Sequence, residues 1–494
     1  MGIAIERSDF SKQEYQIFSE RLQNNLTALA QLIDTPGFGE GPASFGAELE
    51  MYIVDQAGNP ARINEQLIQA SQDPQLQMEL NQFNLEYNLS PVVAQGAPFS
   101  CIEKELQQKL TALESIAKQH HAYIIPIGIL PTLIPEDFCS NALSRATRYQ
   151  ALSKGLQKMR DGPFRIDIDG EPPLALTCDD VTLEGANTSF QVHWRVNPAD
   201  FVDTFNALQL MTPLALAIGA NSPTLLGHML WDETRISLFK QSVDSRDNAS
   251  ISWRMPTRVP FGFGWLRKSP TELFAQTVAL FPPLIPVVGN ENSEQVLKAG
   301  ITPQLEELRL HQGTVWPWNR AIFDPVDGGH LRIEMRSLPA GPTPQDMLAT
   351  SAFLIGLAQY MKSKMDDLIP AMPYQYAEYN FYRAAQKGLD AHLIWPHVKQ
   401  NQPTEQPVTE IIKAYLPLAR EGLAMLEVNA LEIKQYLGLI EDRLLSGITG
   451  ARWQRQVLQR MTKKKNSPEA FVDLLWRYYG EYKSGRAVSE WRML

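Results

Sequence analysis

The chain has 494 residues, of which 44% are hydrophobic and 20% charged, a composition typical of a globular protein with a large core. Its net charge of −10 argues against a nucleic-acid-binding protein, which normally carries a basic face. The three cysteines show no paired spacing, so they give no zinc signature and fit a reducing compartment. The N-terminal segment has no apolar signal region, and the most hydrophobic windows are too short or too interrupted by proline to span a bilayer. We therefore expect a soluble, cytoplasmic protein.

The first half of the chain alternates helical and strand patterns. Apolar spacing predicts helices over residues 11–34, 102–121, about 140–160 and 203–219. Strand patterns cover residues 45–55, 82–91, 122–131 and 187–196, and residues 245–270 are typical of a loop. After residue 336 the patterns are helical, over 345–366, 408–445 and 467–483. This order predicts an α+β fold with a main body over residues 1–370 and a helical C-terminal region over 371–494, packed on the same body.

Residues 330–336, HLRIEMR, form the most informative segment of the chain. Read as a strand, the segment places His330, Arg332, Glu334 and Arg336 on one face and apolar side chains on the other. Alternating opposite charges above an apolar face are unusual for a surface strand. They are typical of a site that handles anionic groups and metal ions. His330 begins the strand, and we do not count it as a ligand.

Three other predicted strands repeat this design with carboxylates and amides. Their polar faces carry Glu48 and Glu50 in the first strand, Glu86 in the second and His193 in the third. An antiparallel sheet with one face on a core and one face in water explains such alternation without any chemistry. The types of polar residue favour a site, because these faces hold Glu, His, Arg, Gln and Asn and contain no Lys.

Several carboxylates on one enclosed face would repel one another and would be costly to desolvate. Mg²⁺ or Mn²⁺ removes this cost, because hard divalent cations prefer carboxylate oxygens and accept an imidazole. Glu79, seven residues before Glu86, is a further possible ligand. Arg332 and Arg336 offer forked donors to carboxylate or phosphate oxygens. The four strands therefore predict a metal site that binds anionic substrates.

At this point the chain resembles the glutamate–cysteine ligase type 2 family, which are carboxylate–amine ligases with a glutamine-synthetase-like fold. The resemblance runs in family order over about residues 45–345. It rests on the Glu48-x-Glu50 strand, LEYNLSP (85–91), the strand with His193, ANSP (220–223) followed by Arg235, and HLRIEMRSLPAGPT (330–343).

The resemblance implies a fold and a reaction. The fold is an antiparallel sheet that forms an active-site funnel, flanked by helices. ATP phosphorylates the γ-carboxylate of glutamate, and an amine then displaces phosphate from the acyl phosphate to leave an amide. The resemblance makes residues 1–370 the catalytic domain. Its substrates would be ATP, glutamate and an amine, with cysteine the default acceptor.

The resemblance also implies roles for individual residues. Arg336 is expected to contact phosphate, while Arg332 has a catalytic role that stays open. Arg235 and Asn221 are expected to bind substrate. The expected ligands of Mg²⁺ or Mn²⁺ are Glu48, Glu50, Glu86, His193 and Glu334. The chain departs from the family pattern at two places. The family usually has Gly-Gly before Glu-x-Glu, and this chain has Gly46-Ala47. The family also has an acidic residue before the position of Glu86, and Glu79 is the only candidate for it here.

Two other functions are open at this stage. One is a ligase with the same chemistry that uses a different acid or amine. The other is a non-catalytic sensor that binds nucleotide or amino acid. We expect neither nucleic-acid nor membrane partners, and assembly into a homo-oligomer is left open. The segment 311–320, which holds Trp316 and Trp318, is either a functional segment, as a lid or an aromatic wall for substrate or adenine, or a structural loop anchored by tryptophan.

Overall fold

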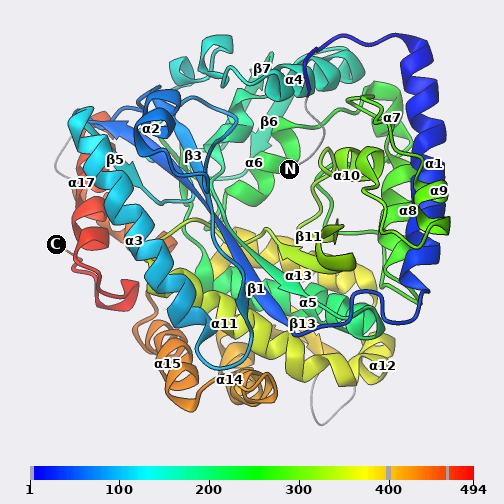
Figure 1. Ribbon diagram of the computed structural model, residues 1–494. Coiled ribbons are helices and arrows are strands. Elements are labelled where there is room, and N and C mark those ends of the chain that lie inside the picture. Colours follow the sequence, from blue (N-terminus) through cyan, green and yellow to red (C-terminus); the bar gives the residue numbers. More distant parts are fainter. Residues whose placement is uncertain (1–4, 397–401, 463–466, 494) are drawn as a thin grey trace.

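A computed structural model describes residues 5–396, 402–462 and 467–493. Its centre is an eight-stranded sheet in which every pairing between strands is antiparallel (Figure 1). The strands in spatial order are β11 (Asn319–Asp324), β12 (His330–Met335), β8 (Phe190–Arg195), β1 (Ser44–Asp55), β3 (Asn84–Asn88) and β2 (Leu76–Met78), with β4 (Val92–Val93) and β5 (Ala122–Ile125) also paired to β1. Strand β1 is the longest of these and connects the two halves of the sheet.

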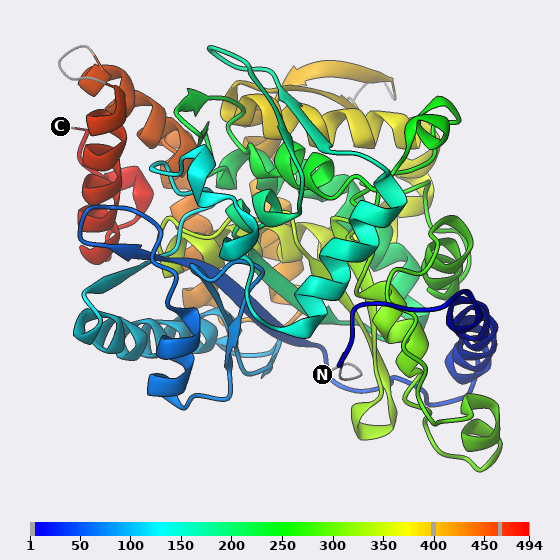
Figure 2. The ribbon, with the colours of Figure 1, turned by 90° about the horizontal axis from the view of Figure 1, so that it is seen from above.

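Helices cover one face of this sheet and form the larger core with it. Alternate residues of β1, such as Leu49 and Met51, are fully buried in this core. The helices of the first 320 residues are α1 (Lys12–Ile33), α2 (Asn64–Ser71), α3 (Pro98–Gln119), α4 (Thr147–Arg160), α5 (Pro198–Gly219), α6 (Arg235–Ser242), α7 (Asn248–Ser252), α8 (Thr271–Leu280), α9 (Ser293–Lys298) and α10 (Glu306–Gln312). Helix α1 lies beside α8 and α9, which are far from it in sequence (Figures 1 and 2).

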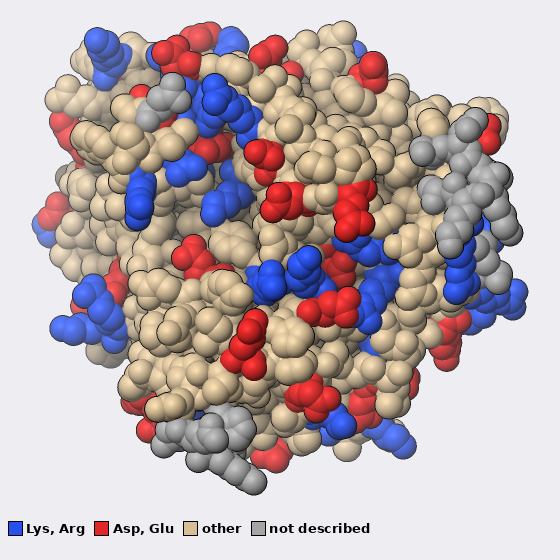
Figure 3. Space-filling model, turned by 180° about the vertical axis from the view of Figure 1, so that it is seen from behind, with Lys and Arg blue, Asp and Glu red and all other residues tan. Residues whose placement is uncertain are grey.

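The later helices complete this core and extend past it. They are α11 (Pro344–Met361), α12 (Met365–Leu368), α13 (Tyr374–Lys387), α14 (Val408–Met425), α15 (Ala430–Ser446), α16 (Gly450–Thr462) and α17 (Ser467–Lys483). Helices α5, α11 and α14 pack against one another. Helix α5 is long and apolar enough to cross a membrane, but 89% of its most apolar window is buried inside the protein, as in a core helix. Charges of both signs interleave over the rear face of the molecule (Figure 3).

The second face of the sheet is only partly open. Tyr52 shares this face with Glu50, yet it is fully buried and its hydroxyl donates to the carbonyl of Ala186 at 2.6 Å. A smaller core, which includes Val54 and residues of α16 and α17, covers this end. The alternative of a sheet with a wholly wet face therefore does not hold, because the C-terminal helices bury the apolar end of this face and leave its charged part as a partly enclosed site.

Most predicted elements are confirmed within a few residues. Three predictions differ more: the strand expected over 122–131 is β5 over Ala122–Ile125 and ends before Pro126, which has no N–H to donate, the helix expected from about 140 begins at Thr147, and the loop expected over 245–270 contains α7. The pattern over 408–445 is two helices, α14 and α15, with Glu427 in a left-handed conformation between them (φ 58°). The chain after residue 336 is not wholly helical, since β13 (His392–Pro396) pairs with β14 (Pro403–Pro407). Short strands bounded by proline give a weak sequence signal. Two further hairpins pair β6 (Phe164–Ile168) with β7 (Leu174–Cys178), and β9 (Thr224–Leu225) with β10 (His228–Met229).

The contact between α11 and α14 gives a test of the packing. A Cβ atom on Gly422 would lie 1.9 Å from the carbonyl oxygen of Gly356, so the helices touch backbone to backbone. We expect Gly422→Ala to lower the free energy of unfolding by about 1–3 kcal/mol or more through overpacking. Gly438→Ala in α15, where nothing lies within 4 Å, is the control and should be neutral or stabilising by up to about 1 kcal/mol. Equal effects of both changes in urea denaturation would contradict this packing.

Candidate active site

The sheet order brings the four charged segments together. Strands β12, β8, β1 and β3 are consecutive neighbours. In the register, His193 lies directly opposite Glu334, and Glu50 lies directly opposite Glu86. Side chains opposite each other on antiparallel strands share one face. Residues separated by up to 286 positions in sequence, from Glu48 to Glu334, therefore line one surface.

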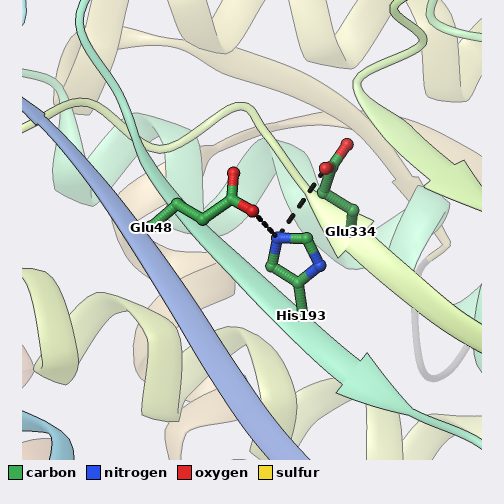
Figure 4. Close-up of side chains that lie close together, drawn as sticks. All are labelled: Glu48, His193 and Glu334. Carbon is green, nitrogen blue, oxygen red and sulfur yellow. Dashed lines mark ion pairs between the residues drawn. The ribbon is translucent and has the colours of Figure 1, made fainter. Parts of the chain in front are cut away.

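The first cluster consists of Glu48, His193 and Glu334 (Figure 4). The Nε2 atom of His193 lies 3.1 Å from Oε1 of Glu48 and 3.7 Å from Oε1 of Glu334. Both ring nitrogens of His193 are buried, and among the described residues neither has a hydrogen-bond partner of good geometry. A buried imidazole nitrogen aimed between two carboxylates is the arrangement that a metal ion would complete.

Two arginines surround Glu334. Arg320 donates two hydrogen bonds to its carboxylate, at 2.7 and 2.9 Å, and Arg336 donates a third at 3.1 Å. Burial acts to raise the pKa of Glu334, but the charges of Arg320, Arg336 and His193 hold it well below its usual range. The contact of Arg320 was not foreseen from the sequence, because it arises from the pairing of β11 with β12.

The second cluster consists of Glu50, Glu79 and Glu86, with potential ligand oxygens within 4.8 Å of one another. Burial and the charge of Glu79 raise the pKa of Glu50 to about 7. Burial and the neighbouring carboxylates raise the pKa of Glu86 well above its usual range. Burial also raises the pKa of Glu79. Glu79, the acidic residue that precedes Glu86 in the sequence, thus lies beside both Glu50 and Glu86.

Both clusters fit divalent cations. The first offers two carboxylates and an imidazole, and the second offers three carboxylates, which are ligand sets that Mg²⁺ and Mn²⁺ accept. In the second cluster the raised pKa values show that the negative charges are poorly compensated by the protein itself. The ligand roles of Glu48, Glu50, Glu86, His193 and Glu334 remain proposals that this geometry supports.

Two charged residues near the second cluster were missed in the sequence. Burial, together with Glu79 and Glu50, raises the pKa of Glu184 well above its usual range. Arg148, at the start of α4, has its pKa raised by Tyr149, Glu79 and Glu86 against the opposing effect of burial. Both lie outside the strands of the main sheet, so no periodic pattern could reveal them.

Arg235 lies behind the charged face and is almost fully buried. Its Nη1 donates to Glu233 at 2.9 Å and to the carbonyl of Ser337 at 3.2 Å, while its buried Nε has no partner in the part of the chain that the structure describes. Glu233 is itself fully buried and also accepts from the hydroxyl of Ser222 and the backbone of Asn221. The ion pair with Glu233 fixes the guanidinium group of Arg235. Its Nε atom is compatible with the predicted contact between Arg235 and a substrate.

Asn221 does not present a free amide to a substrate. Its Nδ2 donates to the carbonyl of Ala340 and to the hydroxyl of Tyr478, and its Oδ1 accepts from Gln454. The residue is fully buried. Both polar atoms of this amide thus bond within the protein, to Ala340 and to residues of α16 and α17, and the substrate-binding role stays a prediction.

The predicted catalytic arginines lie at different places. Arg336 donates to Glu334 of the first cluster and to Gln191, whose amide nitrogen donates to Glu50 of the second cluster at 2.8 Å, so it lies between the two clusters. The charges of Glu334, Glu50 and Glu48 raise the pKa of Arg336 against the effect of burial. Arg332 is one step further along the same face of β12 and pairs with Asp324 at 3.0 Å. Arg332 therefore lies beyond the first cluster, away from the second.

The segment 311–320 is largely structural. His311 and Trp318 are each 1% exposed, and Trp318 packs edge-on against Phe239. Trp316 is half-buried and also packs on Phe239. The structural reading is favoured over the lid, because the tryptophan at the centre of the segment belongs to the core.

Comparison with solved structures shows which fold the chain has. The chain superimposes on a crystal structure of glutamate–cysteine ligase from Francisella tularensis in complex with AMP, with a TM-score of 0.54, 12% identity and 90% of each chain covered. A bifunctional glutathione synthetase from Pasteurella multocida matches with a TM-score of 0.44 and 11% identity, over 95% of this chain and 55% of that one. The fold is that of the glutamine-synthetase-like ligases, as the resemblance implied.

A family model matches part of the sequence. Residues 44–270 match the family model of glutamate-cysteine ligase family 2 (GCS2), which confirms the resemblance over this segment. The strand 330–336 lies outside the matched residues. No curated protein matches the chain. Family and fold together support an ATP-dependent carboxylate–amine ligase.

The raised pKa values predict a dependence of stability on pH. The ordinary pKa of Glu50 is 4.5, and it is raised to about 7 in the folded protein without a metal ion. A carboxyl group whose pKa is raised by folding favours the folded state at a pH below its unfolded pKa. This contribution to the free energy of unfolding is lost as the pH rises through the folded pKa. We therefore expect the melting temperature in EDTA to fall between pH 5 and 8. Added Mn²⁺ should reverse the fall, because metal binding favours the deprotonated ligands.

The double variant Glu50→Gln/Glu86→Gln is the control for this measurement. It should flatten the pH dependence in EDTA and weaken the stabilisation by Mn²⁺. A wild-type melting temperature that rises over this pH window in EDTA would contradict the assignment.

Proposed function

We propose that the protein is an ATP-dependent ligase that activates the γ-carboxylate of glutamate and joins it to an amine, with cysteine as the first acceptor to test. The observation that carries the proposal is the pair of carboxylate clusters on one sheet face with Arg336 between them. The family match and the fold give the reaction class. The identity of the acid and of the amine is part of the proposal.

The proposed reaction has two steps. The γ-carboxylate oxygen of glutamate attacks the terminal phosphorus of ATP, the bond to ADP breaks, and an acyl phosphate forms. The amine nitrogen then attacks the acyl carbon, inorganic phosphate leaves with its electron pair, and the nitrogen loses a proton to give the amide. Neither step requires a covalent enzyme nucleophile, so positioning and charge neutralisation supply the catalysis.

Arg336 has the clearest role in this proposal. Its guanidinium is held by Glu334 and Gln191, and its buried Nε has no protein partner. The surrounding carboxylates keep it charged. A fixed cation with a free donor stabilises the charge that develops on the transferring phosphoryl group. Arg235, fixed by Glu233, is proposed to hold a carboxylate of the acid substrate through its free Nε.

Divalent cations complete the proposed site. Glu48, His193 and Glu334 would hold one of them, and Glu50 and Glu86, with Glu79, would hold another. When bound, Mg²⁺ or Mn²⁺ would neutralise phosphate charge during transfer. We further propose a cytoplasmic location, which fits the unpaired cysteines. The division of the chain at residue 370 is likewise a proposal.

The function is tested by measuring nucleotide turnover. The full chain is incubated with ATP, Mg²⁺ or Mn²⁺, one acid and one amine, over panels that include glutamate and cysteine. We expect release of ADP and phosphate that depends on both glutamate and an amine, together with an amide product detected by mass spectrometry. Turnover with another acid would replace glutamate in the proposal. ATP binding without turnover for any pair would indicate a sensor and refute the ligase.

Arg336→Gln tests the role of this arginine. If its main contact forms in the transition state, kcat should fall by about 100-fold or more, while KM for ATP changes by less than about threefold. Arg165→Gln, on an exposed part of β6, is the matched control and should leave both constants unchanged. A KM that rises as much as kcat falls would show that Arg336 binds ground-state ATP instead.

A further inference from the structure

A polar cavity of about 600 Å³ lies between the tip of the β6–β7 hairpin, the segment 229–232 and helices α13 and α16. Among the described residues, its lining includes no member of the two carboxylate clusters and neither Arg235 nor Arg336. Pockets that enclose a whole drug-sized ligand have about 300–1,000 Å³. The cavity therefore has room for an organic molecule, and it lies outside the candidate active site.

Four of the charged side chains that line this cavity compensate one another. Arg455 of α16 donates to the carboxylate of Asp232 at 2.6 Å. Arg452, on the same helix, pairs with Asp390. These two ion pairs leave no net charge, so the character of the cavity depends on its remaining charged residues.

The other four charged residues of the lining form no ion pair with any residue that the structure describes. Arg383 and Lys387 lie four positions apart on α13 and so share one face of this helix, where like charges repel each other. Asp169 and Glu171 lie at the tip of the β6–β7 hairpin. Uncompensated positive charge on the helix and negative charge on the hairpin suit a ligand that has a carboxylate and an ammonium group.

The tip of the hairpin is held against the segment 229–232. The backbone N–H of Glu171 donates to the carbonyl of Met229 at 2.9 Å. A Cβ atom on Gly170 would lie 2.6 Å from the same carbonyl oxygen, so only glycine permits this approach. This contact fixes the backbone on both sides of Gly170 and so positions the two acidic residues beside the cavity.

Two buried hydrogen-bond donors of the lining have no acceptor within the described parts of the chain. They are the Nε atom of Arg383 and the indole Nε1 of Trp231. Native structures contain few such donors, because a buried donor without an acceptor destabilises the fold. A ligand with carboxylate and amide oxygens would supply the acceptors that the protein lacks here.

We propose that this cavity binds a short peptide with a free amino terminus and a free carboxyl terminus. Arg383 and Lys387 hold its carboxylate. Asp169 and Glu171 hold its ammonium group, and the indole N–H of Trp231 donates to a peptide carbonyl. The volume of the cavity favours such a ligand over an inorganic ion.

The wall of the cavity is connected to Arg235. The backbone carbonyl of Asp232 accepts from the N–H of Ser222 at 3.2 Å. The next residue, Glu233, accepts from the hydroxyl of Ser222 at 2.7 Å and from Arg235 at 2.9 Å. A peptide that shifts Asp232 therefore shifts the partner of Arg235 and changes the affinity for the acid substrate, a consequence that rests on the proposed function.

Triglycine is the probe for the peptide site, because its side chains add no charge. Calorimetry on the full-length chain compares it with N-acetyltriglycine, which lacks the ammonium group, and with triglycinamide, which lacks the carboxylate. We expect triglycine to bind and each blocked peptide to bind about tenfold or more weakly. Equal binding of the three peptides, or no binding of triglycine at about 10 mM, would overturn the proposal.

Two variants locate the site. Arg383→Gln and Glu171→Gln should each weaken triglycine about tenfold or more, because each removes a charge that faces one terminus. Arg165→Gln, on an exposed part of the same hairpin, is the matched control and should leave the binding unchanged. Circular dichroism checks that each variant is folded. Unchanged binding to Arg383→Gln would overturn the site, and so would binding that is lost in Arg336→Gln, which would place the peptide in the candidate active site.

The connection to Arg235 is tested with glutamate. Saturating triglycine should change the affinity for glutamate by about fivefold or more, and saturating glutamate should change the affinity for triglycine by the same factor, because coupling is reciprocal. In Arg383→Gln the same concentration of triglycine should have a smaller effect. An unchanged affinity for glutamate would overturn the connection and leave the peptide site in place. A chain that binds triglycine but no glutamate would overturn the connection together with the proposed function.

Discussion

The repulsion among carboxylates on one enclosed face is the constraint on which the rest of the structure depends. Glu48, Glu50, Glu79, Glu86 and Glu334 lie within two clusters of buried and half-buried side chains, where water screens their charges less than at an open surface. The protein compensates the two clusters differently. Arg320 and Arg336 neutralise Glu334, so its pKa is lowered. No comparable arginine bonds to the second cluster among the described residues, and its pKa values are raised.

This difference gives the site its electrostatic polarity. On one side, the arginines Arg320 and Arg336 donate to Glu334 and compensate its negative charge. The other side, around Glu50 and Glu86, carries negative charge that favours proton or metal binding. Arg336 lies between them and contacts the compensated side directly. A reacting phosphoryl group placed here would meet a fixed cation on one side and a metal-binding group on the other.

The C-terminal helices are part of this arrangement, although they carry no recognisable motif. Tyr478 of α17 bonds to Asn221 and to the carbonyl of Pro126, and Gln454 of α16 bonds to Asn221. Asn221 in turn donates its backbone N–H to Glu233, the partner of Arg235. A chain of buried hydrogen bonds thus runs from the last helices to the arginine behind the site. Such a chain makes the position of Arg235 sensitive to the packing of helices distant in sequence.

The sequence by itself determined the charged strands, most helices and the set of candidate ligands. Alternation with a period of two assigns Glu48, Glu50, Glu86, His193 and Glu334 to polar faces, because side chains on a strand point to opposite sides. Only the tertiary structure decided which strands are neighbours, and so which charges meet. It added the contact of Arg320 with Glu334 and the position of Glu184 near the second cluster, and it showed that the amide of Asn221 bonds to α16 and α17. These outcomes depend on register and on packing between segments far apart in the chain, and no local pattern encodes them.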